Sequence, residues 1–262
     1  MTIKLLPVHE KDCWSGATWV VEDEKFLIEL IARVAIGQSR VVERILRATG
    51  DLPPGFPKGG FEGAKKLLFA DPGGDPYHRD GWIFQIISWI AAHIENNNSQ
   101  ICAPHMIHAH KGFDGLMVEF DDEGIAYVII SEDKATGKPR SMVRDKVWPE
   151  FMEMETGKRD NELIASVTSL LAISGEPNPD AAVASILWGD KRAYRVAVTV
   201  GDQHSTKEGR KKLYKGYEAV VSGDVGKRRA ATLHIPNIRT WFSQIAEKAS
   251  EVIDAEEAKS LV

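Results

Sequence analysis

GFDGLMVEFDDEGIAYVIISEDK, residues 112–134, is the stretch of sequence that decides the fold of this chain. Two apolar runs, 113–120 and 126–130, flank an acidic turn that ends in glycine. Runs of this kind predict strands, and so short a turn predicts that the strands pair as a hairpin. Because successive side chains of a strand point to opposite faces, Glu132 and Lys134 are expected to project from the same face.

The predicted hairpin brings charged side chains together. Asp114 lies at the start of the first strand, so pairing of the strands would place it beside Glu132 and Lys134. Two carboxylates at one strand end repel each other unless a hard cation lies between them, and such oxygen ligands suit Mg²⁺ or Mn²⁺. The Lys134 ammonium can orient a water, help to deprotonate it and offset charge on a reacting phosphate. The simpler hypothesis is an exposed Glu132–Lys134 ion pair, which contributes little stability.

The tripeptide Asp/Glu-x-Lys does not by itself identify the site. The chain contains three such strings, at residues 23–25, 132–134 and 257–259. The first falls at a predicted helix start and the last in a charged tail. Only the middle one follows an apolar strand and has another carboxylate at the start of the preceding strand, so its position favours a functional role.

Working outward from the hairpin, the hydrophobic period predicts the remaining elements. A helix capped by Asp80 and a short strand at 106–110 are expected before it. After it we expect helices around 143–152 and 163–171, a strand at 193–200, a basic helix opened by Ser205 and Glu208, a strand at 229–235 and a helix at 241–253. This order predicts an α/β fold with a mixed, hairpin-containing sheet, and the absence of a GxGxxG turn argues against a dinucleotide fold.

The N-terminal part is predicted to consist mainly of helix and loop. Residues 23–49 have helical spacing interrupted at Gly37, which predicts one broken helix or two, and residues 50–74 are rich in proline and glycine and read mostly as loop. We therefore divide the chain into an N-terminal, mainly helical extension (1–75) and a core with C-terminal basic and helical elements (76–262).

Composition bounds the class of protein. At 262 residues and 43% hydrophobic residues the chain can bury a substantial core. Its two cysteines, Cys13 and Cys102, lie far apart, and no apolar run approaches the ~18 residues of a membrane span. We therefore expect a cytoplasmic protein that does not enter a membrane.

Charge is unevenly distributed along the chain. The formal net charge is −5, yet residues 207–229 contain eight basic and three acidic residues. This segment includes Lys211 and Lys212, and a second basic group, Lys138, Arg140 and Arg144, directly follows the hairpin. Both groups suit contacts with substrate phosphates, and a solvated helix face is the alternative.

The paired motifs Gly-Phe-Asp114-Gly and Ser-Glu132-Asp133-Lys134, flanked by the predicted elements of residues 80–200, resemble the PD-(D/E)XK, or restriction-endonuclease-like, nuclease superfamily. The resemblance implies an αβββαβ core. It implies that Asp114 and Glu132 ligate the metal, that the carbonyl of Asp133 assists, and that Lys134 acts on water. No proline immediately precedes Asp114, and no Gln-x-x-x-Tyr element follows Lys134, so the subfamily is left open.

The same resemblance implies a further residue near the metal, a Glu or Gln from the first core helix. Gln85 is the nearest match, and Glu29 or Glu43 would serve if the earlier helix plays that part.

The phrase His-x-His-Lys-Gly-Phe-Asp-Gly before a Glu-x-Lys strand is also similar to small nuclease subunits of bacterial antiphage systems, such as the Hachiman subunit, which works beside a helicase. That likeness implies DNA as substrate and a helicase or ATPase subunit as partner. Two other functions stay open: a non-catalytic binding or assembly subunit that retains the fold, and an RNA-processing nuclease.

Overall fold

The computed structural model describes residues 2–48, 55–70, 75–96, 98–108, 112–122, 124–188 and 190–260. In these residues seven strands form one mixed sheet, in the order β1-β2-β7-β6-β5-β4-β3. The strands are β1 (Ile3–Glu10), β2 (Trp14–Val21), β3 (Gln100–Ile101), β4 (Gly115–Asp121), β5 (Gly124–Lys134), β6 (Arg192–Val200) and β7 (Arg228–His234). Strands β2, β7, β6 and β5 are parallel, and the pairings of β1 with β2, β4 with β5 and β3 with β4 are antiparallel. The predicted α/β class with a mixed sheet is confirmed.

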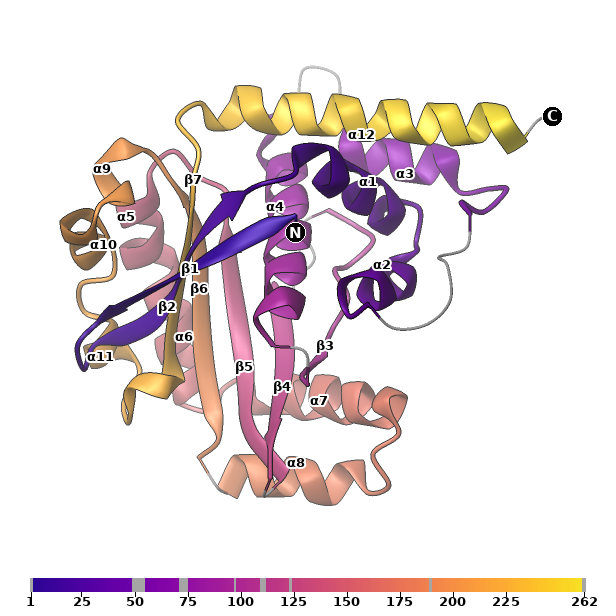
Figure 1. Cartoon of the computed structure of the whole chain (residues 1–262). Helices are drawn as coiled ribbons and strands as arrows, with labels where there is room; N and C mark the ends of the chain where they lie inside the picture. The colour runs from indigo at the N-terminus through magenta and orange to yellow at the C-terminus, as the bar shows by residue number, and fades with distance from the viewer. Residues whose placement is uncertain are drawn as a thin grey trace.

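Helices cover both faces of the sheet (Figure 1). One face carries α1 (Glu24–Ala35), α2 (Ser39–Leu46), α3 (Phe61–Leu68), α4 (Tyr77–Glu95) and α12 (Ile238–Ser260). The other carries α5 (Pro139–Met142), η1 (Val143–Val147), α6 (Trp148–Glu155), α7 (Asp160–Ser174), α8 (Pro179–Trp188), α10 (Lys207–Leu213) and α11 (Tyr217–Val220). The short α9 (Asp202–Ser205) follows β6, and η2 (Val225–Lys227) precedes β7.

Strand β6 is buried on both sides, which explains its nearly continuous apolar sequence. Ala197 packs in the core under α4, and Val196 and Val198 pack in the core on the opposite face.

The central hairpin is confirmed. Strands β4 and β5 pair antiparallel, with Leu116 opposite Ile130. Strand β5 continues beyond the predicted apolar run to Lys134, because β6 pairs with it in parallel as far as Lys134 opposite Val198. Glu132 and Lys134 therefore lie within a strand and not after it.

The strand predicted at 106–110 is wrong for residues 106–108, and residues 109 and 110 lie outside the described residues. The chain instead forms β3 at Gln100–Ile101, paired with Val118 and Met117 of β4. His108 is used differently: its Nε2 lies 2.9 Å from the carbonyl oxygen of Leu67. This contact holds the segment against α3 and away from the sheet.

The N-terminal part contributes to the sheet, which the sequence analysis did not predict. Strands β1 and β2 form a hairpin, and β2 pairs in parallel with β7, from the far end of the chain. Helix α3 lies within the predicted loop 50–74, where Phe61 and Leu68 enter the core shared by α1, α4 and α12. Residue 75 therefore does not divide the hydrophobic core.

Two predicted helix starts are wrong. Helix α4 begins at Tyr77, and Asp80 is a fully buried residue of its first turns that pairs with Arg79 (2.7 Å) and with Arg239. Helix α10 is capped by Thr206, whose hydroxyl accepts the N–H of Gly209 (3.1 Å), and not by Ser205. Asp80 is engaged in a tertiary ion pair that local spacing does not contain, whereas the start of α10 is decided by a local cap one residue later than predicted.

The other helical predictions hold. Helices α1 and α2 are separated at Gly37, whose φ of 89° is favourable only for glycine. Helix α12 starts three residues before the predicted helix and continues to Ser260. In the described residues no helix has both the length and the apolar character needed to cross a membrane.

His93 of α4 makes the stability of the fold sensitive to acid. Its imidazole is fully buried against Trp89, with ring centroids 4.6 Å apart, and burial together with the charge of Arg47 lowers its pKa to about 3. Because the folded-state pKa lies below the unfolded value of about 6.5, this group's contribution is complete above pH 6.5 and is lost as pH falls towards 3.

Between pH 7 and pH 5 the wild type should lose about 2 kcal/mol of free energy of unfolding that His93→Leu does not lose, so the variant gains that amount relative to wild type. Urea denaturation of both proteins at the two pH values measures this difference. An equal difference at both pH values would show that His93 does not stay neutral in the fold.

Candidate active site

The three residues at the centre of the sequence prediction converge at one end of the central hairpin. The Lys134 ammonium donates to Glu132 Oε2 (2.7 Å) and to Asp114 Oδ2 (3.0 Å). Glu132 and Lys134 share one face of β5, as predicted from strand alternation. Asp114 directly precedes β4, where Gly115 pairs with Ser131 of β5, and this register brings its carboxylate to the end of β5.

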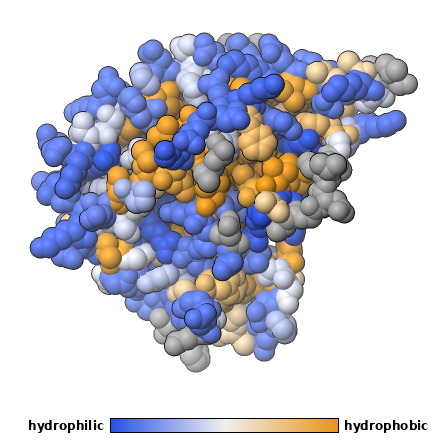
Figure 2. Space-filling view, viewed as in Figure 1, coloured by the Kyte–Doolittle hydropathy of each residue, from blue (hydrophilic) through white to orange (hydrophobic). Residues whose placement is uncertain are grey.

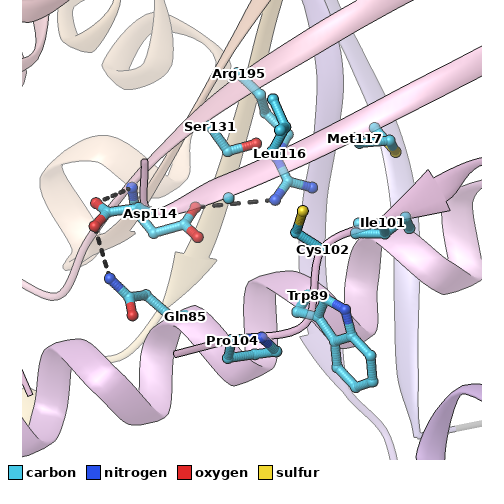
Figure 3. Close-up of a pocket in the computed structure, with 13 residues that line it drawn as sticks. Gln85, Trp89, Ile101, Cys102, Pro104, Asp114, Leu116, Met117, Ser131 and Arg195 are labelled. Carbon is cyan, nitrogen blue, oxygen red and sulfur yellow. Dashed lines mark hydrogen bonds and ion pairs between the residues drawn. The ribbon is translucent and has the colours of Figure 1, made fainter. Parts of the chain in front are cut away.

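Asp114 is fixed from several sides. Its Oδ1 accepts a hydrogen bond from Gln85 Nε2 (2.7 Å), and its Oδ2 also accepts the backbone N–H of Asp133 (3.0 Å). Figure 3 shows Gln85 of α4 facing Asp114 at one end of the pocket drawn there. With Lys134, three donors hold this carboxylate in one orientation.

Of the three candidates for the helix residue, the structure brings Gln85 to the cluster. Glu29 pairs with Arg33 on α1 (3.1 Å), and Glu43 pairs with Arg47 on α2 (3.2 Å). Both carboxylates are therefore engaged on helices other than α4. The sequence alone left this choice open because it does not say which helix packs over the hairpin.

The electrostatics of the cluster favour added positive charge. The side chain of Glu132 is 4% exposed, and burial followed by repulsion from Asp114 holds its pKa well above the ordinary value. Burial acts to lower the pKa of Lys134, but Glu132 and Asp114 outweigh it, so the net pKa is raised. Glu150 of α6 adds a further negative charge facing both residues. The cluster thus stabilises a cation or a proton more than it stabilises a further anion.

Asp133 lies on the opposite face of β5 and its side chain has another partner. Its Oδ1 accepts the Ser88 hydroxyl (2.8 Å), and the same hydroxyl oxygen accepts Arg195 Nη2 (2.6 Å). Burial raises the pKa of Asp133 to about 6. The Asp133 carboxylate is therefore directed away from Glu132, and the predicted metal contact through the Asp133 carbonyl stays a prediction.

The buried Ser88 belongs to the same helix as Gln85, the residue that contacts Asp114. Ser88 lies one helical turn after Gln85, so α4 presents both side chains to the hairpin. Arg195 extends from β6 and lies between Ser131 and Cys102 in Figure 3. Helix α4 and strands β5 and β6 are thereby joined directly behind Asp114, which keeps the site in register.

The residues present suit a hard cation by their chemistry. Asp114 and Glu132 supply carboxylate oxygens, the ligands that Mg²⁺ and Mn²⁺ prefer. In the described residues no three His, Cys, Asp or Glu side chains form a group that could hold a metal ion. The ammonium of Lys134 already bridges the two carboxylates. A cation held by Asp114 and Glu132 would therefore compete with Lys134.

An open pocket of about 540 Å³ lies beside the cluster. Asp114, Lys134 and Gln85 form part of its wall. The rest of the wall includes Tyr77, His78 and Trp82 of α4 and, from other segments, Met142, Lys146, Glu150 and Arg239. Sequence reasoning did not single out Glu150 or Arg239, because neither belongs to a local motif and only the packing of α6 and α12 brings them here.

The predicted phosphate-contacting residues have different surroundings. Lys138 and Lys212 are exposed. Arg144 is exposed and pairs with its neighbour Asp145 (2.5 Å), and Lys211 pairs with Glu10 of β1 (2.8 Å). These surface pairs are weak and leave the cations accessible to a phosphate.

Arg140 has a structural contact that sequence reasoning did not predict. Its Nη1 donates to the carbonyl oxygens of Leu213 (2.8 Å) and Lys215 (3.1 Å) at the end of α10. This joins the basic segment after the hairpin to the basic helix. The side of the molecule formed by α9, α10 and α11 is largely hydrophilic in Figure 2. The two basic segments therefore lie together at the edge where parallel strands β5 and β6 end.

Comparisons with protein-family models, curated proteins and solved structures gave no match for this chain. Its function is therefore inferred from the site.

Proposed function

We propose that this protein hydrolyses DNA phosphodiester bonds in a metal-dependent reaction at Asp114, Glu132 and Lys134. The observation that carries the proposal is that the Lys134 ammonium is bonded to two carboxylates, Asp114 at the start of β4 and Glu132 of β5. Lys134 and Asp114 line an open pocket, and Lys134 is bonded to the buried Glu132. Together they supply what such a reaction needs: a cation site and a positive charge next to the reacting phosphate.

The residues have distinct roles in this proposal. Asp114 and Glu132 hold Mg²⁺ or Mn²⁺, which when bound supplies charge stabilisation to the scissile phosphate. Gln85 orients Asp114 through its 2.7 Å hydrogen bond. Lys134 leaves the carboxylates, orients the attacking water and offsets charge on the phosphate.

The order of elements supports the proposal. Helix α4 is followed by β3, β4 and β5, then by helices, then by β6, and these four strands are adjacent in the sheet. This arrangement agrees with the αβββαβ core implied by the resemblance to PD-(D/E)XK nucleases. The likeness to antiphage nuclease subunits leads us to propose action within a bacterial defence complex, controlled by a helicase or ATPase partner.

The test is cleavage of labelled DNA and RNA by the full chain in Mg²⁺, Mn²⁺ or EDTA. We expect metal-dependent cleavage of DNA that falls about 1000-fold in Glu132→Gln, the equivalent of ~4 kcal/mol of lost charge stabilisation. Glu29→Gln is the matched control. Glu29 pairs with Arg33 on α1, so this variant should keep wild-type activity.

Other outcomes would select another function. Preferential cleavage of RNA would favour the RNA-processing nuclease. Absence of cleavage of every substrate, with candidate partners added, would contradict the proposal and favour the non-catalytic binding or assembly subunit.

A further inference from the structure

The pocket beside Lys134 has an aromatic wall that hydrolysis alone does not require. Tyr77 and His78 begin α4, with their ring centroids 3.9 Å apart and their planes inclined by 40°. Tyr77 is 49% exposed although it lines a pocket. Its backbone N–H donates to Asp75 Oδ1 (3.0 Å), so an anchored helix start presents the ring.

The same pocket carries cations on other elements. Lys146 of η1 is exposed. Arg239 of α12 pairs with the fully buried Asp80, yet its side chain remains 45% exposed. Asp80 therefore holds this guanidinium in place while part of it faces solvent. Both cations can contact a phosphate, and Lys134 marks the side of the pocket where the proposed reaction occurs.

These features match a nucleotide in size and chemistry. The volume of about 540 Å³ falls within the ~300–1000 Å³ typical of small-ligand sites. Every nucleobase has an aromatic face that stacks on tyrosine without regard to sequence, and a phosphate binds Lys and Arg. In an intact duplex both faces of a base are covered by its neighbours, so Tyr77 gains a base partner only from an unpaired strand.

We propose that this pocket binds one unpaired nucleotide, with its base on Tyr77 and a phosphate between Lys146 and Arg239. The substrate of the site is then single-stranded DNA or the unpaired end of a duplex. The inference rests on the proposed function, because it makes the pocket the substrate-binding part of the same site.

Binding is measured separately from cleavage, by fluorescence anisotropy of the full chain in EDTA with a short labelled single strand and its duplex. Tyr77→Ala should weaken binding of the single strand about 5- to 100-fold and leave duplex binding unchanged. Tyr77→Phe should keep wild-type binding, because it keeps the ring.

Two further variants separate stacking from charge and from general surface effects. Lys146→Ala should weaken the binding of both the single strand and the duplex, because a phosphate contact does not depend on strandedness. Phe69 has an aromatic ring that is 45% exposed but does not line this pocket. Phe69→Ala should therefore leave the binding of both the single strand and the duplex unchanged.

Three results would overturn the inference. Tyr77→Ala could weaken the binding of single strand and duplex equally, or weaken neither. The wild type could also bind duplex and single strand with equal affinity. Cleavage in Mg²⁺ reports on the proposed function independently. If the wild type cleaves DNA but Tyr77→Ala binds the single strand as tightly as wild type, only the nucleotide pocket is overturned. An inactive wild type that loses single-strand binding in Tyr77→Ala supports the pocket and overturns the proposed hydrolysis.

Discussion

Replacing Lys134 with methionine should lower the rate of DNA cleavage by about 100- to 1000-fold, the range expected when a group that stabilises developing charge is removed. The same change should raise the affinity for Mn²⁺. Lys134 bridges Asp114 and Glu132 at 3.0 and 2.7 Å, so its ammonium competes with a metal ion for both carboxylates. Single-turnover cleavage and calorimetric titration with Mn²⁺ measure the two effects.

The opposite directions of the two effects make this prediction specific. A general loss of structure would weaken both cleavage and metal binding. Lys248→Met is the matched control, since Lys248 pairs with Glu24 on the surface (2.6 Å) and should affect neither quantity. Wild-type cleavage by Lys134→Met would remove lysine from the proposed chemistry, and unchanged Mn²⁺ affinity would show that no competition occurs.

Gly16→Ala should lower the free energy of unfolding by about 3 kcal/mol or more, at or above the upper end of ordinary overpacking costs. Gly16 of β2 lies opposite Ala230 of β7, and a Cβ at this position would lie 1.8 Å from the carbonyl oxygen of Ala230. The contact is with backbone, so relief requires the two strands to separate. Chemical denaturation measures the loss.

Gly63→Ala is the matched control for that change and should act in the opposite direction. Gly63 lies in α3, and nothing lies within 4 Å of a Cβ placed there. Replacing a helical glycine by alanine in free space should stabilise the fold by about 0.5–1 kcal/mol. Equal effects of the two substitutions would contradict the close approach of β2 to β7.

The hairpin and its charged residues were predictable because their signals are local. Apolar alternation identified β4 and β5, and strand alternation placed Glu132 and Lys134 on one face. The convergence of Asp114 followed from the short turn alone. In such a segment the sequence contains nearly all the information that fixes the geometry.

The N-terminal strands and the pocket walls were not predictable, because distant residues decide them. Strand β1 is half exposed and contains Pro7, a residue that argues against a strand, and β2 is stabilised by pairing with β7, which follows it by some 200 residues. Arg239 reaches the pocket only because α12 packs against α4. Arg140 was predicted to contact phosphate from its charge, but its hydrogen bonds to the end of α10 depend on tertiary packing.

The central claim is tested most directly by the rate at which the purified full chain cleaves a labelled single-stranded DNA over a titration with Mg²⁺, beside Asp114→Asn. The account predicts no cleavage in EDTA, a rate that rises to saturation with Mg²⁺ in wild type, and no comparable rate in Asp114→Asn at any concentration. Cleavage that persists in EDTA, or a wild-type rate in Asp114→Asn, would contradict it.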